Sequence, residues 1–137
     1  MAKEIRRKAI EQNRAKFAWE YAEKSKESGA LTDKYRSHVR EFPMLVLTCG
    51  LVNAIAFAYE KGKISGKEGE GDKGWKMLYQ HLEKWFKTDS ENKVLDFSTD
   101  EGLLKRVLRI PSSDIQMMRN VTNETISLFI WLKRFVS

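Results

Sequence analysis

The residue types best suited to catalysis in this sequence are two histidines and a single cysteine. His38 and His81 are far apart in the chain, and each lies among aromatic residues, so we expect hydrogen-bonded structural roles for both. Cys49 lies between apolar residues and Gly50, which predicts a buried, small side chain and not an activated nucleophile. We therefore expect no catalytic residue among these three.

The acidic residues and the glycine-rich segment do not predict an active site either. Asp89 with Glu91, and Asp100 with Glu101, lie in polar segments, where solvated helix caps are the expected role. The spacings HxxxH, HExxH, CxxC and EF-hand are absent, so we expect no metal site and no cofactor. The glycines lack the GxxxxGK[ST] order and follow no predicted strand, which argues against a phosphate-binding loop of that type.

Clustered basic residues are the one feature of the sequence that points to binding. The chain carries a net charge of +6 and has a pI of about 9.4. Clustered Lys and Arg neutralise phosphates without reading base sequence. The same pattern also fits solvated helix faces, and the sequence has no RRM, KH or zinc-finger signature. The candidate RNA-binding residues are Arg36, Arg40, Lys105, Arg106, Arg109, Lys133 and Arg134.

The segments that carry these basic residues show mainly the apolar spacing of α-helices. Apolar residues recur three and four apart through 4–27, 75–87 and a last segment that ends near Phe135. No segment alternates strictly, as a half-buried strand would. The sequence therefore predicts an all-α fold, a single compact helical bundle of about six helices with no sheet, in one domain over 1–137. A flexible loop is expected at about 62–74, which holds five of the eight glycines.

The central part of the chain predicts two breaks. Pro43 predicts that a helix over 33–41 ends there and that a short buried helix covers 44–48. Gly50 then permits a turn into a nearly all-apolar helix over 51–60, which we expect at the centre of the bundle.

Polar residues ahead of apolar runs predict where the helices begin, and Pro111 predicts the end of the penultimate helix. Three apolar residues are expected to fix the otherwise polar segment 88–99 to the core, namely Val94, Leu95 and Phe97. The expected N-caps are Thr32, then Thr99 or Asp100, then Ser112 or Ser113.

Composition also indicates the compartment. A single cysteine excludes an internal disulfide and fits a reducing environment. The first residues have no apolar h-region, and the longest apolar run is far shorter than the ~20 residues that span a bilayer. We expect a cytoplasmic protein that makes no contact with a membrane.

Three long stretches and the first helix resemble one family. They read EQNRAKFAWEYAEK from Glu11, KYRSHVREFPMLVLTCGLVNAIAFAYEKG from Lys34, GWKMLYQHLEKWF from Gly74 and LLKRVLRIPSSDIQMMRNVTNETISLFIWLKRFVS from Leu103. In this order and spacing they resemble the small subunit of Cmr-type (type III-B) CRISPR effector complexes. The chain departs from the family at Cys49, where a small polar residue such as asparagine is expected.

The resemblance implies an all-α, non-catalytic subunit in antiviral defence. Several copies stack head to tail as a filament beside the backbone subunits that hold the guide RNA. The groove between the filaments takes the guide–target duplex, and basic residues of the small subunit hold the target strand. The implied partners are the backbone and large subunits, other copies of the chain, and the guide and target RNA. Within the matched phrases, Arg36 and Arg40 are the first candidates, because arginine suits phosphate geometry.

Other functions stay open from the residues alone. A protein-interaction module, whose basic face meets acidic partner subunits without touching nucleic acid, is the main alternative. A helix-turn-helix regulator is a further one, although its recognition helix over 51–59 would offer almost no base-reading side chains. A hydrolase has no triad, metal site or carboxylate pair to support it.

Overall fold

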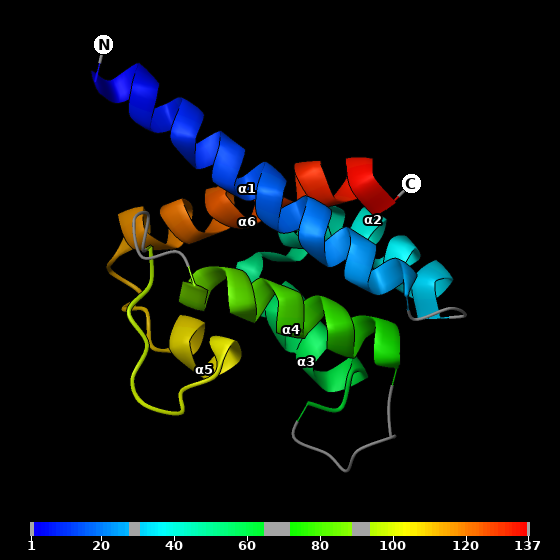
Figure 1. Ribbon diagram of the computed structural model, residues 1–137. Coiled ribbons are helices and arrows are strands. Elements are labelled where there is room, and N and C mark those ends of the chain that lie inside the picture. Colours follow the sequence, from blue (N-terminus) through cyan, green and yellow to red (C-terminus); the bar gives the residue numbers. More distant parts are fainter. Residues whose placement is uncertain (1, 28–30, 65–71, 89–93, 137) are drawn as a thin grey trace.

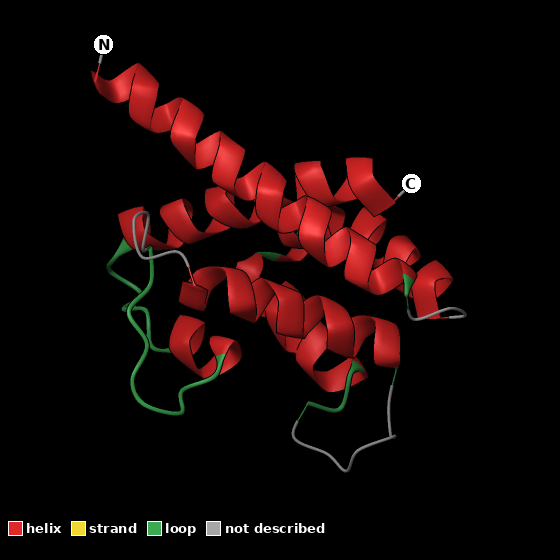
Figure 2. Ribbon diagram, in the orientation of Figure 1, coloured by secondary structure: helices red, strands yellow, loops and turns green. Residues whose placement is uncertain are grey.

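Six α-helices make up the part of the chain that the computed structural model describes, which is residues 2–27, 31–64, 72–88 and 94–136. Figure 2 shows these helices joined by loops, and no strand occurs in the four described ranges. The predicted all-α bundle is therefore confirmed. The helices are α1 (Ala2–Lys26), α2 (Leu31–Cys49), α3 (Leu51–Lys61), α4 (Lys73–Thr88), α5 (Leu103–Leu108) and α6 (Ile115–Val136).

The helices form two layers, and α2 contacts helices of both. Helices α1, α2 and α6 make the upper layer in Figure 1, and α3, α4 and α5 make the lower layer. Helix α2 contacts α1 and α6 in its own layer, and α3 and α4 in the other. Its buried residues Tyr35, Val39, Phe42 and Val46 recur at helical spacing and reach the centre of the core.

The break predicted at Pro43 is wrong. Helix α2 runs without interruption from Leu31 to Cys49, with Pro43 inside it. A proline in a helix interior costs about 3 kcal/mol, because it removes a hydrogen bond and its ring clashes with the preceding turn. Buried Val39 and Phe42 before Pro43, and buried Val46 after it, hold both halves of the helix against the core and offset this cost.

The short buried helix predicted for residues 44–48 is also wrong, because only one side of this turn meets the core. Val46 is buried, whereas Met44 and Leu47 are exposed. Cys49, predicted to be buried, is exposed as well. The turn at Gly50 is confirmed: its φ of +88° is a left-handed conformation that glycine adopts readily.

Helix α5 begins where α4 supplies the caps, and not at the predicted Thr99 or Asp100. Its N-cap residue, Gly102, has no side chain, and the helix ends at Leu108. The Leu103 N–H donates to Glu83 Oε2 at 2.8 Å, and the Leu104 N–H donates to the Tyr79 hydroxyl at 2.9 Å. Two α4 side chains thus satisfy free N–H groups at this helix start.

The other predicted caps differ from those in the structure too. Asp114, and not Ser112 or Ser113, caps α6, since its Oδ1 accepts the Met117 N–H at 3.0 Å. Helix α2 already includes Thr32, so this residue is not its N-cap.

The glycine-rich segment predicted over 62–74 has its central residues, 65–71, outside the described ranges. Helix α4 begins at Lys73, two residues before the predicted start. Asp72 Oδ1 accepts the N–H groups of Gly74 at 2.8 Å and of Trp75 at 3.2 Å, so Asp72 caps the helix. After α4, Leu95 is buried as predicted and fixes the following segment to the core.

None of the described helices combines the length and the apolar composition that crossing a membrane requires.

Candidate nucleic-acid interface

Arg36 and Arg40 lie one turn apart on α2, on the flank of the helix that adjoins α6. Arg36 is half-buried, and its Nε donates to the backbone carbonyl of Val136 at 2.7 Å. Its Nη1 also lies 3.5 Å from the exposed carboxylate of Asp33. Arg40 is exposed, and its side chain makes no hydrogen bond or ion pair with the residues that the structure describes. The pair therefore consists of one anchored guanidinium and one that is open to a ligand.

The C-terminal turn of α6 brings another predicted basic residue to this flank. The Arg36–Val136 bond and the contact between the Phe42 and Phe129 rings, whose centroids are 5.0 Å apart, show that α2 and α6 run antiparallel. Lys133 lies on α6 between these two contacts and is exposed. Arg36, Arg40 and Lys133 therefore share one end of the α2–α6 contact, and we call these three residues the basic cluster.

Arg134 lies on a different side of α6 from the basic cluster. Its guanidinium carbon is 4.9 Å from the centroid of the Trp131 ring, an arrangement typical of a cation–π contact. Trp131 Nε1 donates to Glu11 Oε2 of α1 at 3.0 Å, so this side of the helix adjoins α1. Lys133 and Arg134, adjacent in sequence, are thus directed to separate surfaces.

The structure does not bring the basic residues of α5 to the basic cluster. Helix α5 packs on α3 in the lower layer, away from the C-terminal end of α6 (Figure 1). Lys105 is exposed there. Arg106 is only 5% exposed, and its Nε donates to the Asp96 carbonyl at 2.5 Å. Arg106 fixes the segment before α5 to the core, so the geometry argues against its predicted role as an RNA contact.

Arg109 is held by a carboxylate that we predicted to be a solvated cap. Its Nε and Nη2 each donate to a Glu101 oxygen at 2.9 Å, a bidentate pair. Glu101 is buried and also accepts the Ser98 N–H at 3.0 Å, so the solvated role predicted for it is wrong. The Arg109 guanidinium and the Ser98 N–H lower the pKa of the Glu101 carboxyl to about 2. The charge of Arg109 is therefore largely balanced within the chain.

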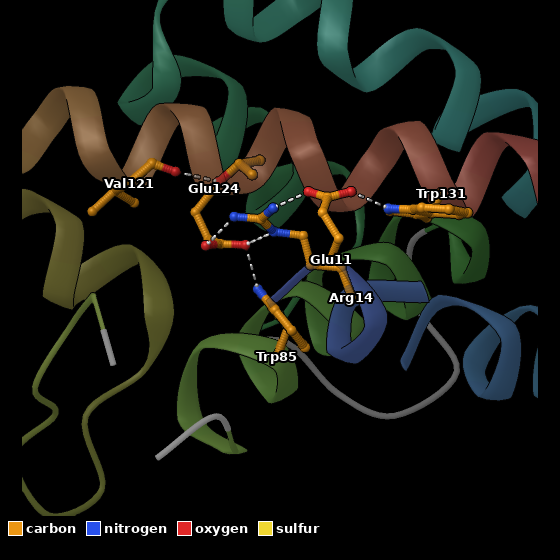
Figure 3. A network of polar contacts seen from close by, with 7 residues as sticks. Glu11, Arg14, Trp85, Val121, Glu124 and Trp131 are labelled. Atoms are coloured by element: carbon orange, nitrogen blue, oxygen red, sulfur yellow. Dashed lines mark hydrogen bonds and ion pairs between the residues drawn. The ribbon is translucent and has the colours of Figure 1, made fainter. Parts of the chain in front are cut away.

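An ion-pair network between α1 and α6 is the main polar feature that the sequence patterns did not predict (Figure 3). Arg14 of α1 donates to buried Glu124 of α6 through Nε at 2.6 Å and Nη2 at 2.9 Å. Glu124 Oε2 also accepts Trp85 Nε1 of α4 at 3.3 Å, and Arg14 has Glu11 as a second partner. Hydrogen bonding to Glu124 raises the pKa of Arg14 above its ordinary value. The network joins three helices, and both of its carboxylates, Glu11 and Glu124, are hydrogen-bonded.

A cavity of about 560 Å³ opens beside this network. Its wall on α6 is a stripe of neutral polar residues one turn apart, Gln116, Asn120, Asn123 and Ser127. These groups offer hydrogen bonds, but among the described residues that line the cavity no nucleophile is hydrogen-bonded to a base. Among the described residues, no three His, Cys, Asp or Glu side chains come together as a metal ion would require.

Both histidines are held by hydrogen bonds, as the sequence predicts. His38 Nε2 lies 3.2 Å from Asp72 Oδ2, and the His38 ring stacks on Trp75 with centroids 4.1 Å apart. His81 Nδ1 and the buried Tyr35 hydroxyl share a hydrogen bond of 2.7 Å. Burial, with a smaller contribution from the charge of Lys24, lowers the pKa of His81 to about 4.

His81 should make the fold sensitive to mild acid. His81 is protonated near pH 6.5 in the unfolded chain but only near pH 4 in the folded chain. The contribution of neutral His81 to the free energy of unfolding is therefore fully present above pH 6.5. This contribution is lost as the pH falls from 6.5 to 4. Between pH 7 and pH 5 the free energy of unfolding should fall by about 2 kcal/mol. Urea denaturation at both pH values measures this loss.

The control is His81→Gln, which retains a hydrogen-bonding group near Tyr35 but does not titrate. Glu101, with its pKa of about 2, loses its contribution only below pH 4.5 and so does not interfere at pH 5. An equal loss of stability in the wild type and in His81→Gln would show that another group causes the acid sensitivity.

The family of the chain follows from a comparison with known proteins. A family model described as CRISPR-associated protein (Cas_Cmr5) matches residues 10–137. The match runs from within α1 to the end of α6, so it includes the basic cluster, the α5 residues and the Arg14–Glu124 network. This confirms the resemblance that the motifs indicate, and it covers nearly the whole chain. The chain therefore belongs to the Cas_Cmr5 family and is a small subunit of the CRISPR Cmr complex.

Proposed function

We propose that the chain is a non-catalytic structural subunit that stacks in a filament within the effector complex and holds the target strand of the guide–target duplex. The observation that carries this proposal is the basic cluster. Arg36 and Arg40 come from α2 and Lys133 from the far end of the sequence, yet all three lie at the same end of the α2–α6 contact. Asp33 pairs with Arg36, and an exposed pair at 3.5 Å neutralises Arg36 only weakly.

The arrangement suits the phosphate backbone and not the bases. The Val136 carbonyl orients the Arg36 guanidinium, which leaves its other N–H groups for a phosphate. Arg40 next to it supplies a second set of donors. In this proposal the guide RNA selects the target by base pairing, and the subunit recognises charge and shape, as RNA-guided effectors of other types do.

One copy makes few phosphate contacts, so the isolated chain should bind RNA weakly. Copies held side by side in a complex add their contacts through effective concentration, without any new interaction in each copy. The proposal does not require Lys105, Arg109 or Arg134, which lie on other surfaces. It excludes Arg106, whose side chain is buried.

The double variant Arg36→Ala/Arg40→Ala should retain the fold and weaken target-RNA binding by the reconstituted complex. We expect an affinity loss of at least about tenfold at physiological salt, and a decrease of roughly 1 to 2 per bound copy in the steepness of log K against log salt, because each copy loses two phosphate contacts. Circular dichroism checks the fold, and filter binding over a series of salt concentrations measures both quantities.

The matched control is Lys24→Ala/Lys26→Ala on α1. These two lysines already pair with Glu20 at 3.3 Å and Glu23 at 3.4 Å, so their loss should leave the affinity unchanged. RNA affinity of Arg36→Ala/Arg40→Ala equal to that of the wild type would refute the assignment of the cluster.

A protein-interaction module that never contacts nucleic acid is the second candidate function. The observation that favours it is the pair of exposed apolar side chains, Met44 and Leu47, on α2 beside the cluster. If this function is the true one, the double arginine variant will fail to join the complex, and RNA affinity will fall only to that of the complex without the chain.

A further inference from the structure

Three aromatic rings meet where α1 contacts the last turns of α6. Trp19 of α1 is 54% exposed. The Phe135 ring of α6 lies against it, with centroids 5.2 Å apart and an angle of 87° between the planes. Trp131, one turn before Phe135, stacks on Phe135 with centroids 5.9 Å apart, and both of these α6 rings are half-buried. We call Trp19, Trp131 and Phe135 the aromatic platform.

One end of the aromatic platform is fixed and the other is open. Trp131 Nε1 donates to Glu11 Oε2 at 3.0 Å, which holds this ring between the two helices (Figure 3). At the other end, the perpendicular pair brings the edge of one ring to the face of its neighbour, so Phe135 covers at most one face of the Trp19 indole. Because more than half of Trp19 is exposed, its indole offers a flat apolar surface on which another ring can stack.

Two cations border the aromatic platform. Lys16 lies one turn before Trp19 on α1, and Arg134 lies one turn after Trp131 on α6. Both are exposed, and neither forms an ion pair with the residues that the structure describes. The Arg134 guanidinium carbon is 4.9 Å from the Trp131 ring centroid. A guanidinium stacked in this way still has N–H groups at its edge, which suit a phosphate.

The carboxylates near the aromatic platform already have cationic partners on α1. The pairs are Glu20 with Lys24 at 3.3 Å, Glu23 with Lys26 at 3.4 Å, and Glu11 with Arg14, which also holds buried Glu124. With Lys16 and Arg134 added, five cations stand against four acids, a net charge of +1. The surroundings are therefore weakly positive, and the two cations without an acidic partner are those at the platform itself.

This charged setting favours nucleic acid over a protein partner. The centre of a protein–protein interface is depleted in Lys and Glu, whereas Lys16, Glu20 and Glu23 all lie within one turn of Trp19. A protein that covered Trp19 would have to desolvate these charges, which is costly. A single base can cover the indole and leave the charged groups in water. Interfaces with nucleic acid are also polar and positively charged.

We propose that the aromatic platform stacks an unpaired base of a bound RNA strand on Trp19, while Lys16 and Arg134 contact the phosphates on either side of it. Every base has a flat face, so such a site is tolerant of sequence but requires a base that is free of a duplex. The inference rests on the proposed contact with RNA, but it uses another surface, other residues and another part of the nucleotide than the basic cluster does.

The test measures how the full-length chain binds two labelled single strands of about ten nucleotides. One is oligouridylate, and the other is an abasic strand of equal length, which has the riboses and phosphates but no bases. Trp19→Ala should bind oligouridylate about tenfold more weakly than the wild type and should bind the abasic strand equally well. Fluorescence anisotropy at low salt, where the weak binding of one copy is strengthened, measures both affinities.

Two further variants control for the loss of the side chain. Trp19→Phe retains a ring and should stay within about threefold of the wild type on oligouridylate. Leu108→Ala shortens an apolar side chain that is 62% exposed on α5, away from the platform, and should bind both strands as the wild type does. Trp19 is mostly exposed and alanine favours helix, so Trp19→Ala should fold, which circular dichroism checks.

In the assembled complex, a crosslink identifies the strand that supplies the base. Iodouridine forms crosslinks with aromatic rings that stack on it, and it is placed either in the guide or in the target. A crosslink to Trp19 from one of the two strands is the expected result. Crosslinks from neither strand would contradict the proposal.

Equal affinity of the wild type and Trp19→Ala for oligouridylate would overturn the inference. So would an equal loss on both strands, because the abasic strand has no base to stack. Arg36→Ala/Arg40→Ala should weaken both strands by the same factor, since these arginines are proposed to contact phosphates. Wild-type affinity in that double variant, with the loss in Trp19→Ala confined to oligouridylate, would refute the role of the basic cluster and support the aromatic platform.

Discussion

Replacing Glu124 with alanine should lower the free energy of unfolding by about 3 to 5 kcal/mol, because it removes one partner of a buried ion pair and leaves the other charged. Glu124 accepts hydrogen bonds from Arg14 Nε, Arg14 Nη2 and Trp85 Nε1. All three donors would lose this partner, and Arg14 would retain only Glu11 on its own helix. Urea denaturation at pH 7 measures the loss.

Two further variants separate the ion pair from the helix that carries it. Asn123→Ala removes an exposed neighbour of Glu124 and should change stability by less than about 0.5 kcal/mol. Arg14→Leu/Glu124→Leu removes both charges and should cost much less than Glu124→Ala, because no buried charge is left without a partner. A loss below about 1 kcal/mol in Glu124→Ala would mean that Arg14 and Trp85 find solvent or other partners.

Phe42→Ala should destabilise the chain by about 3 to 5 kcal/mol through loss of buried surface and formation of a cavity. Phe42 has no exposed surface, and its ring lies 5.0 Å from that of Phe129 and 6.4 Å from that of Trp75. It therefore links α2 to both α6 and α4. It also precedes Pro43, where the helix has lost a hydrogen bond and depends on packing.

Leu47→Ala is the matched control for Phe42→Ala. It shortens an apolar side chain on the same helix that is 68% exposed, and should cost less than about 1 kcal/mol. Thermal or urea unfolding compares the two variants under one set of conditions. Similar small losses in both would show that the α2–α6 core repacks around the missing ring.

Local patterns of the sequence predicted the helices well. In α4 the apolar residues Leu78, Leu82, Trp85 and Phe86 recur at helical spacing, and all four are buried. Gly50 marked the turn between α2 and α3, and it adopts the left-handed φ that the turn needs. These features depend on neighbours a few positions away, which the sequence contains explicitly.

Features that depend on tertiary contacts were predicted poorly. A local rule ends a helix at Pro43, but buried Phe42 and Val46 hold α2 together across it. The start of α5 is capped by Glu83 and Tyr79, which are remote in sequence, so no nearby Ser, Thr or Asp marks it. N-cap prediction uses only residues next to the helix start, so it fails when side chains of another helix accept the free N–H groups.

Some residues of the candidate site could likewise be placed from local sequence, and others could not. The spacing of Arg36 and Arg40 placed them on one flank, since both belong to one helix. Nothing in the local sequence brought Lys133 to them or turned Arg106 inward, because these outcomes depend on how α6 and the segment before α5 pack. Glu124 in a largely apolar helix was a usable signal for a buried ion pair, since an isolated acid on such a helix needs a partner.

The most direct test of the central claim is a photo-crosslink from the basic cluster to RNA in the assembled complex. Ser37 is exposed on α2 between Arg36 and Arg40, so a photoreactive amino acid in its place removes no cation. Gln80, exposed on α4, is the comparison position. Position 37 should crosslink to the target strand, and position 80 should give no crosslink to it. Crosslinks from position 37 to protein alone, with target RNA bound, would contradict the RNA role proposed for the basic cluster.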